Sequence, residues 1–300
     1  LDPSGVAAAD VVGGYSGGSY KGVAAIDQVY PRLRLVPGLL LSPGYSHLPT
    51  VATALSAKAH AVNGAFRALA VCDLSTDVAA IPTYADAGAW KANNGFDQLD
   101  QVTTWPKVKN GANVYHSSTV FACVCDVTDA ANAGVPFASP SNKAVSATAA
   151  VNDDGDEILL DRSQANALNA QGIVTVLNGF YGWRLWGNRT AAYPGTTDVK
   201  DSMIPVRRMF SWIGNTIILT TDRDVDAPVN RRFVDSVAGT IGTFLNGLTA
   251  QGALVDGKIE FEPDDPAFFD FLVFFSALSS AAAAGFSVAL AFSAFSALAA

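Results

Sequence analysis

The chain has 300 residues, enough for one large domain or two; half of the residues are hydrophobic and 15% are charged. This composition supplies a hydrophobic core and excludes a chain without fixed structure. The formal net charge of −8 argues against direct binding of nucleic acid, because such a surface needs lysine and arginine to displace the counterions of phosphate groups.

The three cysteines, Cys72, Cys123 and Cys125, cannot form a complete set of disulfides, and we expect buried free thiols. Free thiols fit assembly in a reducing cytosol. The sequence opens on Leu1-Asp2-Pro3, without an initiator methionine and without the basic region and apolar run of a signal peptide. We therefore expect the original start to lie upstream or to have been removed by processing.

Residues 1–22 are rich in glycine, serine and alanine, which predicts a flexible N-terminal segment. An α/β domain is expected over residues 23–160. It opens with a strand over residues 33–41, a helix from Pro49 to Gly64 and a strand over residues 68–74. This order predicts a right-handed crossover with parallel strands. The domain then continues with a helix near 76–87, a strand near 102–108, a helix over 116–133 and a polar loop over 140–156.

Residues 161–266 are expected to form a C-terminal core domain that begins with a β-hairpin. The β-branched run Ile173–Leu177 predicts a buried strand, and Asn178-Gly179 is the pair most typical of a tight turn. The returning strand, Phe180–Trp186, carries too much aromatic area to be exposed on both faces. Two long amphipathic helices follow, the first capped at Asp201 or Ser202 and the second running from Pro228 to Gly252, and a strand over residues 254–261 ends the region. The expected fold class is α/β, with a mixed sheet flanked by helices.

The C-terminal tail, residues 267–300, contains only alanine, phenylalanine, serine, leucine, valine, glycine and one aspartate. Hydropathy alone predicts a membrane span over residues 271–300. The segment lacks flanking basic residues and a belt of tryptophan and tyrosine, so we expect no membrane anchoring. We regard the sequence of this tail as doubtful and assign it no chemistry beyond a candidate role as an inter-subunit arm.

The returning strand and the turn after it resemble the signature of contractile tail sheath proteins, which occur in myophages, R-type pyocins and related injection machines. The residues that carry this resemblance are Gly182, Trp183, Arg184, Leu185, Trp186, Gly187, Asn188, Arg189 and Thr190. Two other stretches are similar to sheath proteins in the same order: residues 31–38 followed by residues 66–73, and the loop Ser139–Lys143. The resemblance covers residues 31–266 and fails at both ends of the chain.

No group of residues predicts catalysis, a cofactor or a metal. Ser46 and His47 are adjacent, but the second glycine of a nucleophile elbow is missing and neighbouring side chains point apart. The three scattered histidines lack the spacing of a zinc site. The acidic run Asn152–Glu157 lacks the order of a calcium loop. For Arg184 and Arg189, which flank the end of the hairpin, a structural ion pair, within the fold or between subunits, is favoured over an anion site.

The resemblance implies a structural protein and not an enzyme. Copies of a sheath protein stack as hexameric rings into a helical sheath around an inner tail tube, between baseplate and tail terminator proteins. Contraction, driven by the difference between two packings of the same chain, pushes the tube through the envelope of the target cell. Terminal arms that add strands to a neighbour's sheet would link the subunits. The implied location is a virion tail assembled in the host cytoplasm.

Two alternatives come from other classes of protein. The early strand–helix–strand unit is also typical of a flavodoxin-like enzyme or small-molecule binding domain. That alternative predicts a polar cluster at the carboxyl ends of residues 33–36 and 68–74, where the sequence offers Asp73. The apolar tail is the only feature that favours the second alternative, a membrane-anchored protein.

Overall fold

The computed structural model describes residues 5–222, 231–259 and 288–291. The chain divides into two compact units, the first made of residues 1–63 and 67–211 and the second of residues 64–66 and 212–300. The expected boundary at residue 160 does not separate these units. Strand β9 (Ile173–Gly179), which follows that boundary, pairs with strand β5 (Gln101–Thr104), which precedes it.

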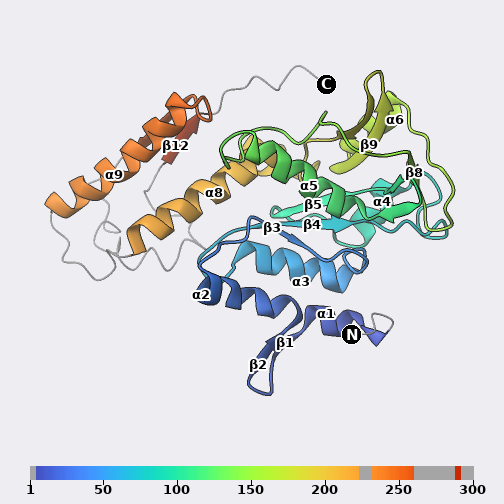
Figure 1. Cartoon of the computed structure of the whole chain (residues 1–300), viewed down its shortest axis with the longest axis horizontal. Helices are drawn as coiled ribbons and strands as arrows, with labels where there is room; N and C mark the ends of the chain where they lie inside the picture. The colour runs from blue at the N-terminus through green and yellow to red at the C-terminus, as the bar shows by residue number, and fades with distance from the viewer. Residues whose placement is uncertain (1–4, 223–230, 260–287, 292–300) are drawn as a thin grey trace. The chain divides into compact units, whose positions relative to one another are not determined.

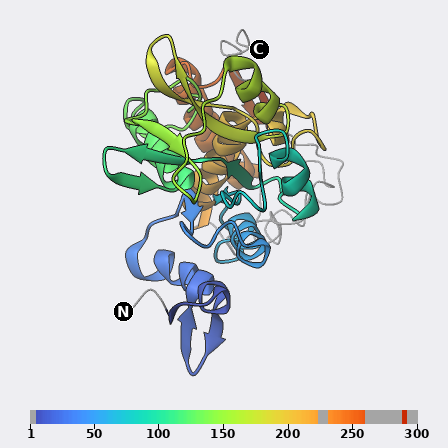
Figure 2. The ribbon, with the colours of Figure 1, turned by 90° about the vertical axis from the view of Figure 1, so that its right-hand side faces the viewer.

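A mixed five-stranded sheet forms the centre of the first unit, in the order β10-β9-β5-β4-β3 (Figure 1). Strands β3 (Leu39–Leu41), β4 (Leu69–Asp73), β5 and β9 are parallel, and β10 (Gly182–Trp186) runs antiparallel to β9. Helices α3 (Pro49–His60) and α5 (Ser117–Ala130) lie on opposite faces of the sheet (Figures 1 and 2). Every residue of β4 and β5 is buried, as expected for parallel strands covered on both faces. The α/β class with a mixed sheet is confirmed.

The strand expected over residues 33–41 is shorter than predicted. Helix α2 (Val29–Leu33) comes first and ends at Arg34, whose φ of 57° is left-handed, so that only Leu39–Leu41 joins the sheet. Leu33 and Leu35 are 64% and 61% exposed, although both are apolar. Pro37, which has no amide to donate to a neighbouring strand, separates this exposed stretch from β3.

The N-terminal segment has regular structure where the composition predicted flexibility. Helix α1 (Ala8–Val12) is followed by strands β1 (Gly14–Ser16) and β2 (Ser19–Lys21) and by a 3₁₀ helix, η2 (Gly22–Gln28). The two strands form an antiparallel ribbon that projects from its unit (Figure 2). Gly17 and Gly18 fill its turn with φ values of 60° and 78°, which glycine adopts readily. The glycines therefore serve a tight turn and not a loose linker.

Two predictions in the middle of the first unit also differ from the structure. Residues 76–86 form turns instead of the expected helix, and helix α4 (Ala87–Asn93) begins only afterwards. Pro82 lacks the amide that a helix interior needs. The single strand expected near 102–108 is in fact two strands, with Pro106 between them. The strand before Pro106, β5, belongs to the central sheet. The strand after it, β6 (Lys107–Asn110), belongs to a separate sheet with β7 (Asn113–Tyr115) and β8 (Ala149–Val151).

The second unit contains most of the C-terminal helices. Helix α8 (Ile204–Thr221) begins in the first unit and ends in the second, and helix α9 (Arg231–Ala250) lies wholly in the second. The buried stripe of α9 consists of Val234, Val237, Ile241, Leu245 and Leu248. Strand β11 (Asp256–Ile259) pairs antiparallel with β12 (Val288–Ala291). The predicted helix start at Pro228 and most of the tail, residues 267–300, lie outside the described residues. In the part that is described, no helix has the length and apolar character needed to cross a membrane.

The cysteines are all free, but they are not all buried. Cys72 and Cys125 are buried, and burial raises the pKa of each thiol to about 12. Cys123 is exposed, so the expectation of burial is wrong at this position. Two residues along a helix correspond to more than half a turn, so Cys123 and Cys125 point to different sides of α5.

The core of the first unit depends on the inner face of α5. Phe121 is fully buried in a cluster that includes Val71, Val102, Val174 and Leu185 from the central sheet. Because such interiors are close-packed, removing a large side chain leaves a cavity that the surroundings fill only partly.

We expect Phe121→Ala to lower the free energy of unfolding by about 3–5 kcal/mol, the usual cost of deleting a buried phenylalanine. Val127→Ala is the matched control, because Val127 lies on the same helix and is 72% exposed. Urea denaturation followed by circular dichroism measures both changes. Equal losses in the two variants would contradict the assignment of Phe121 to the core.

Candidate functional site

The family signature starts in the β9–β10 hairpin, whose turn differs from the prediction. Asn178 pairs with Trp183 and Gly179 with Gly182, so Phe180 and Tyr181 form the turn. Asn178-Gly179 was expected to fill it but instead ends β9. The positive φ that accompanies this reversal falls on Gly182, at 83°, after the turn.

The two faces of β10 are anchored differently. Leu185 is buried and Trp183 packs against the core of the first unit. Trp186 points the other way, and its indole Nε1 donates a hydrogen bond of 2.8 Å to Oδ1 of Asn166. Asn166 belongs to helix α6 (Arg162–Asn169), which packs against β9. Both faces of the returning strand are therefore covered, as the aromatic content required.

The free edge of β10 is covered by the loop Ser139–Lys143, the second stretch that resembles sheath proteins. The amide of Leu185 donates to the carbonyl of Lys143 at 3.0 Å, and the amide of Asn142 donates to the carbonyl of Leu185 at 2.7 Å. The guanidinium of Arg184 donates to the carbonyl of Asn142 at 2.6 Å. Two motifs more than forty residues apart along the chain thus form one backbone-paired structure.

Gly187 and Asn188 continue this contact beyond the strand. The amide of Gly187 donates to Oγ of Ser141 at 3.1 Å, and Oγ of Ser139 donates to Oδ1 of Asn188 at 2.9 Å. Gly187 has a φ of 131°, and a Cβ at this position would lie 3.0 Å from Cα of Val174. Glycine is therefore required here both by its backbone conformation and by the close approach of β9.

The last two signature residues bind the segment that leads into α8. Thr190 is fully buried; its amide donates to the carbonyl of Ser202 at 2.9 Å and its hydroxyl to the carbonyl of Asp201 at 2.6 Å. Arg189 donates to Oγ of Ser202 at 3.3 Å, and its guanidinium lies 4.6 Å from the ring centroid of Tyr193. Within the described residues, Arg184 and Arg189 are therefore held by hydrogen bonds and ring contacts and not by an ion pair inside the fold.

A buried lysine binds backbone carbonyls next to the end of the signature. Nζ of Lys91, on α4, donates to the carbonyls of Ala191, Gln171 and Tyr193 at 2.6, 2.8 and 3.0 Å. The residue is 5% exposed, and burial lowers the pKa of its ammonium to about 8. Sequence reasoning missed this contact, because its partners are backbone carbonyls distant along the chain.

The first turn of α8 is fixed by buried charges. Arg207 donates from Nε to Oδ1 of Asp100 at 2.7 Å and from a terminal nitrogen to Asp201 at 3.1 Å. Nδ1 of His60 lies 2.7 Å from the other oxygen of Asp100. Asp201 also belongs to the segment that holds Thr190, so this network and the signature share a support.

The flavodoxin-like alternative predicted a polar cluster at the end of β4, and one is present. The carboxylate of Asp73 accepts hydrogen bonds from the amide and hydroxyl of Ser118 at 2.8 and 2.6 Å, and from the hydroxyls of Thr104 and Ser46 at 3.0 and 3.1 Å. These bonds fasten the first turn of α5 to the sheet. The parallel strands β3, β4, β5 and β9 also lie side by side in the order of the sequence. This order lacks the reversal, or topological switch point, at which flavodoxin-like domains bind ligands.

The other candidates from the sequence do not come together into a reactive site. Ser46 is fully buried and bonded to Asp73, while burial lowers the pKa of the neighbouring His47. In the acidic run, Asp153 pairs with Lys107 at 2.5 Å. Within the described ranges, no group of three or more histidine, cysteine, aspartate or glutamate side chains is placed to hold a metal ion.

Comparison with solved structures defines the class of fold. The chain is similar to the sheath complex of an extracellular contractile injection system, PVC, in its contracted state, with a TM-score of 0.66 and 21% sequence identity. That similarity covers 91% of this chain and 72% of the sheath chain. The fold is therefore that of the sheaths of contractile injection systems.

Sequence comparison finds related proteins. The chain is 30% identical to a protein described as a prophage major tail sheath protein from Pseudomonas aeruginosa strain UCBPP-PA14, over 86% of this chain. It is 28% identical, over 87% of its length, to the tail sheath protein of Burkholderia phage BcepMu. No family model matches the chain. These two relatives are similar to the chain in the way that the sequence resemblance to contractile tail sheath proteins led us to expect. The chain spans less than two thirds of the length of either relative. The matches span 64% and 56% of these two relatives.

We expect Gly187→Ala to destabilise the first unit by about 1–3 kcal/mol, the usual cost of a strained backbone conformation. Gly179→Ala is the matched control in the same hairpin, because its added methyl group would meet nothing within 4 Å and its φ is not positive. Urea denaturation of the two variants makes the comparison. A loss at Gly179 as large as that at Gly187 would refute the proposed close contact with Val174.

The lowered pKa of Lys91 predicts a pH dependence of stability. Between pH 8 and the ordinary value of 10.5, the unfolded chain holds a proton that the folded chain has released. The free energy of unfolding should therefore rise with pH in this window, by up to about 1.4 kcal/mol per pH unit relative to Lys91→Met. Urea denaturation of both proteins at pH 8, 9 and 10 measures the difference, and parallel pH profiles would contradict it.

Proposed function

We propose that the chain is a structural subunit of a contractile tail sheath, which polymerises around an inner tube and contracts to drive that tube through the envelope of a target cell. The observation that carries this proposal is the sequence similarity to tail sheath proteins, which runs through 86% of the chain and includes the signature hairpin. We propose a purely structural role, without catalysis, for Gly182–Thr190.

The way in which the hairpin is held supports this role. Loop Ser139–Lys143, helix α6 and the segment that leads into α8 contact the signature, and Lys91 binds the carbonyl of Ala191, the residue that follows it. A unit tied together in this way can move as a rigid body, which is how a lattice changes between two packings. In this proposal the work of contraction comes from the difference in free energy between those packings and needs no bound nucleotide.

The ends of the chain are the proposed links between subunits. The β1–β2 ribbon near the N-terminus and the β11–β12 pair near the C-terminus are two-stranded, so each offers backbone groups at its edges to an added strand. We propose that these arms reach neighbouring copies in stacked hexameric rings. The further partners of this proposal are the inner tail tube protein, the baseplate and the tail terminator. The proposed location is a virion tail assembled in the host cytoplasm, without direct binding of nucleic acid and without membrane anchoring.

Electron microscopy of the purified chain tests the proposal. At rising protein concentration, we expect tubes with six-fold symmetry, and we expect a variant lacking residues 1–22 to lose them while keeping its circular dichroism spectrum. Discrete particles at every concentration, alone and with the tube protein, would refute the proposed sheath. Intact contractile tubes from the shortened variant would refute the role of the N-terminal arm.

A further inference from the structure

The tip of the β9–β10 hairpin exposes two aromatic side chains. Phe180 is 90% exposed and Tyr181 83%, more than any other large hydrophobic residue of the described chain. A tip without function is normally polar, because nothing there shields apolar area from water. The tip extends from β10, which is held on both faces and at its outer edge. The strand behind the tip would therefore lose little conformational entropy if a partner covered the tip.

Arginine side chains stack beside these rings. The guanidinium of Arg184 lies 5.5 Å from the ring centroid of Tyr181. The guanidinium of Arg162 lies 5.7 Å from the centroid of Phe180 and 5.3 Å from that of Trp186. Stacking holds each guanidinium by its face and leaves the edge of Arg162 able to bind a carboxylate. Arg184 already donates from one terminal nitrogen to the carbonyl of Asn142, so it can offer a partner only its other terminal nitrogen. Aromatic residues and arginine are the types most enriched among residues that dominate protein interfaces.

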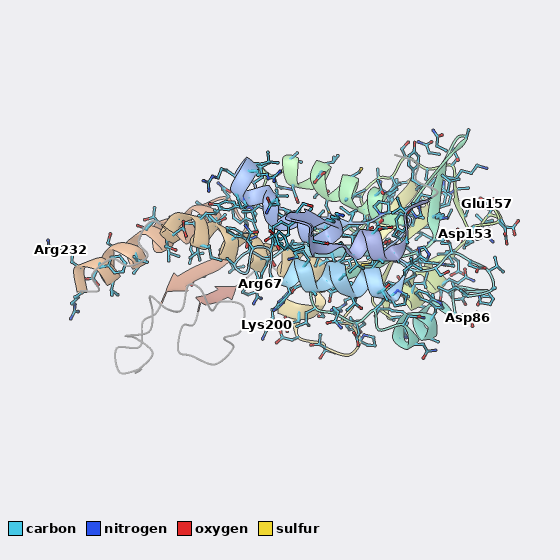
Figure 3. The ribbon with its side chains drawn as sticks, turned by 90° about the horizontal axis from the view of Figure 1, so that it is seen from below. Arg67, Asp86, Asp153, Glu157, Lys200 and Arg232 are labelled. Carbon is cyan, nitrogen blue, oxygen red and sulfur yellow. The ribbon has the colours of Figure 1, made fainter. Side chains whose placement is uncertain are left out.

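The chain itself carries a surface with complementary chemistry. Four of the five residues in the exposed loop 153–157 are acidic, in a chain whose formal net charge is −8. Asp153 is paired with Lys107, whereas Asp154, Asp156 and Glu157 form no ion pair within the described residues. Leu159, which follows this loop, is 69% exposed. Figure 3 shows Asp153 and Glu157 close together at one end of the first unit, well away from Lys200.

From this complementarity we infer that the hairpin tip of one copy docks on loop 153–157 of a neighbouring copy. Phe180 and Tyr181 cover Leu159, and Arg162 and Arg184 face the unpaired carboxylates. The contact joins two different surfaces, so it can repeat from copy to copy along a lattice. The inference rests on the proposed function, because it requires copies of this chain to polymerise.

The test compares the assembly of variants of the full chain. The double variant Phe180→Ser/Tyr181→Ser removes the rings, and the triple variant Asp154→Asn/Asp156→Asn/Glu157→Gln removes the free charges. Val127→Ser is the control, because it changes an exposed apolar side chain on α5, away from the hairpin. Sedimentation gives the concentration at which tubes form. We expect both multiple variants to raise it at least about tenfold, the effect of losing roughly 1.4 kcal/mol at an interface, and the control to leave it unchanged.

A charge exchange tests the pairing itself. Arg162→Glu should weaken assembly, and adding Glu157→Lys to it should restore part of the loss; thermal melting confirms that each variant folds. Tubes of the double variant at the hairpin tip, formed at the wild-type concentration, would overturn the inference. Normal assembly of the acidic-loop variant would overturn it as well, as would a defect that appears only when the tube protein is present. If the unchanged chain forms no tubes at all, the proposed function fails first, which is a distinguishable result.

Discussion

The structure depends on the backbone pairing of β10 along both of its edges. On one edge it pairs with β9, and on the other the loop around Asn142 and Lys143 exchanges hydrogen bonds with Leu185. A last strand with a free edge would be an open template for pairing with other chains. Here that edge is occupied from within, by the hydrogen bonds between Leu185 and the loop, so β10 is not such a template.

The sequence predicted the parts of this arrangement that depend on local pattern. Residues 173–177 were expected as a buried strand from their β-branched side chains, α5 from its alanine-rich sequence and α9 from apolar residues at helical spacing. The resemblance to sheath proteins pointed to residues 182–190. The turn of the β9–β10 hairpin was predicted two residues too early, because Asn178-Gly179 has the right turn chemistry but Gly182 supplies the positive φ.

Contacts between distant residues could not be predicted in the same way. Lys91 lies outside every helix and strand that the sequence predicted, and its burial depends on three carbonyls that only the folded chain brings together. Asp73 was expected at the end of a strand, yet its role is decided by Ser118 in the first turn of α5, whose amide and hydroxyl donate to the Asp73 carboxylate. A polar cluster at the carboxyl end of parallel strands can therefore attach a helix to the sheet by hydrogen bonds, and it does not by itself indicate a binding site.

The exposed position of Cys123 makes motion within an assembly measurable. It is the one accessible thiol among the three cysteines, since Cys72 and Cys125 are buried and remain protonated at neutral pH. A maleimide dye would therefore attach at a single known point on α5 without any engineering of the chain. Energy transfer between dyes on adjacent copies would then report how far neighbouring helices travel when an array shortens.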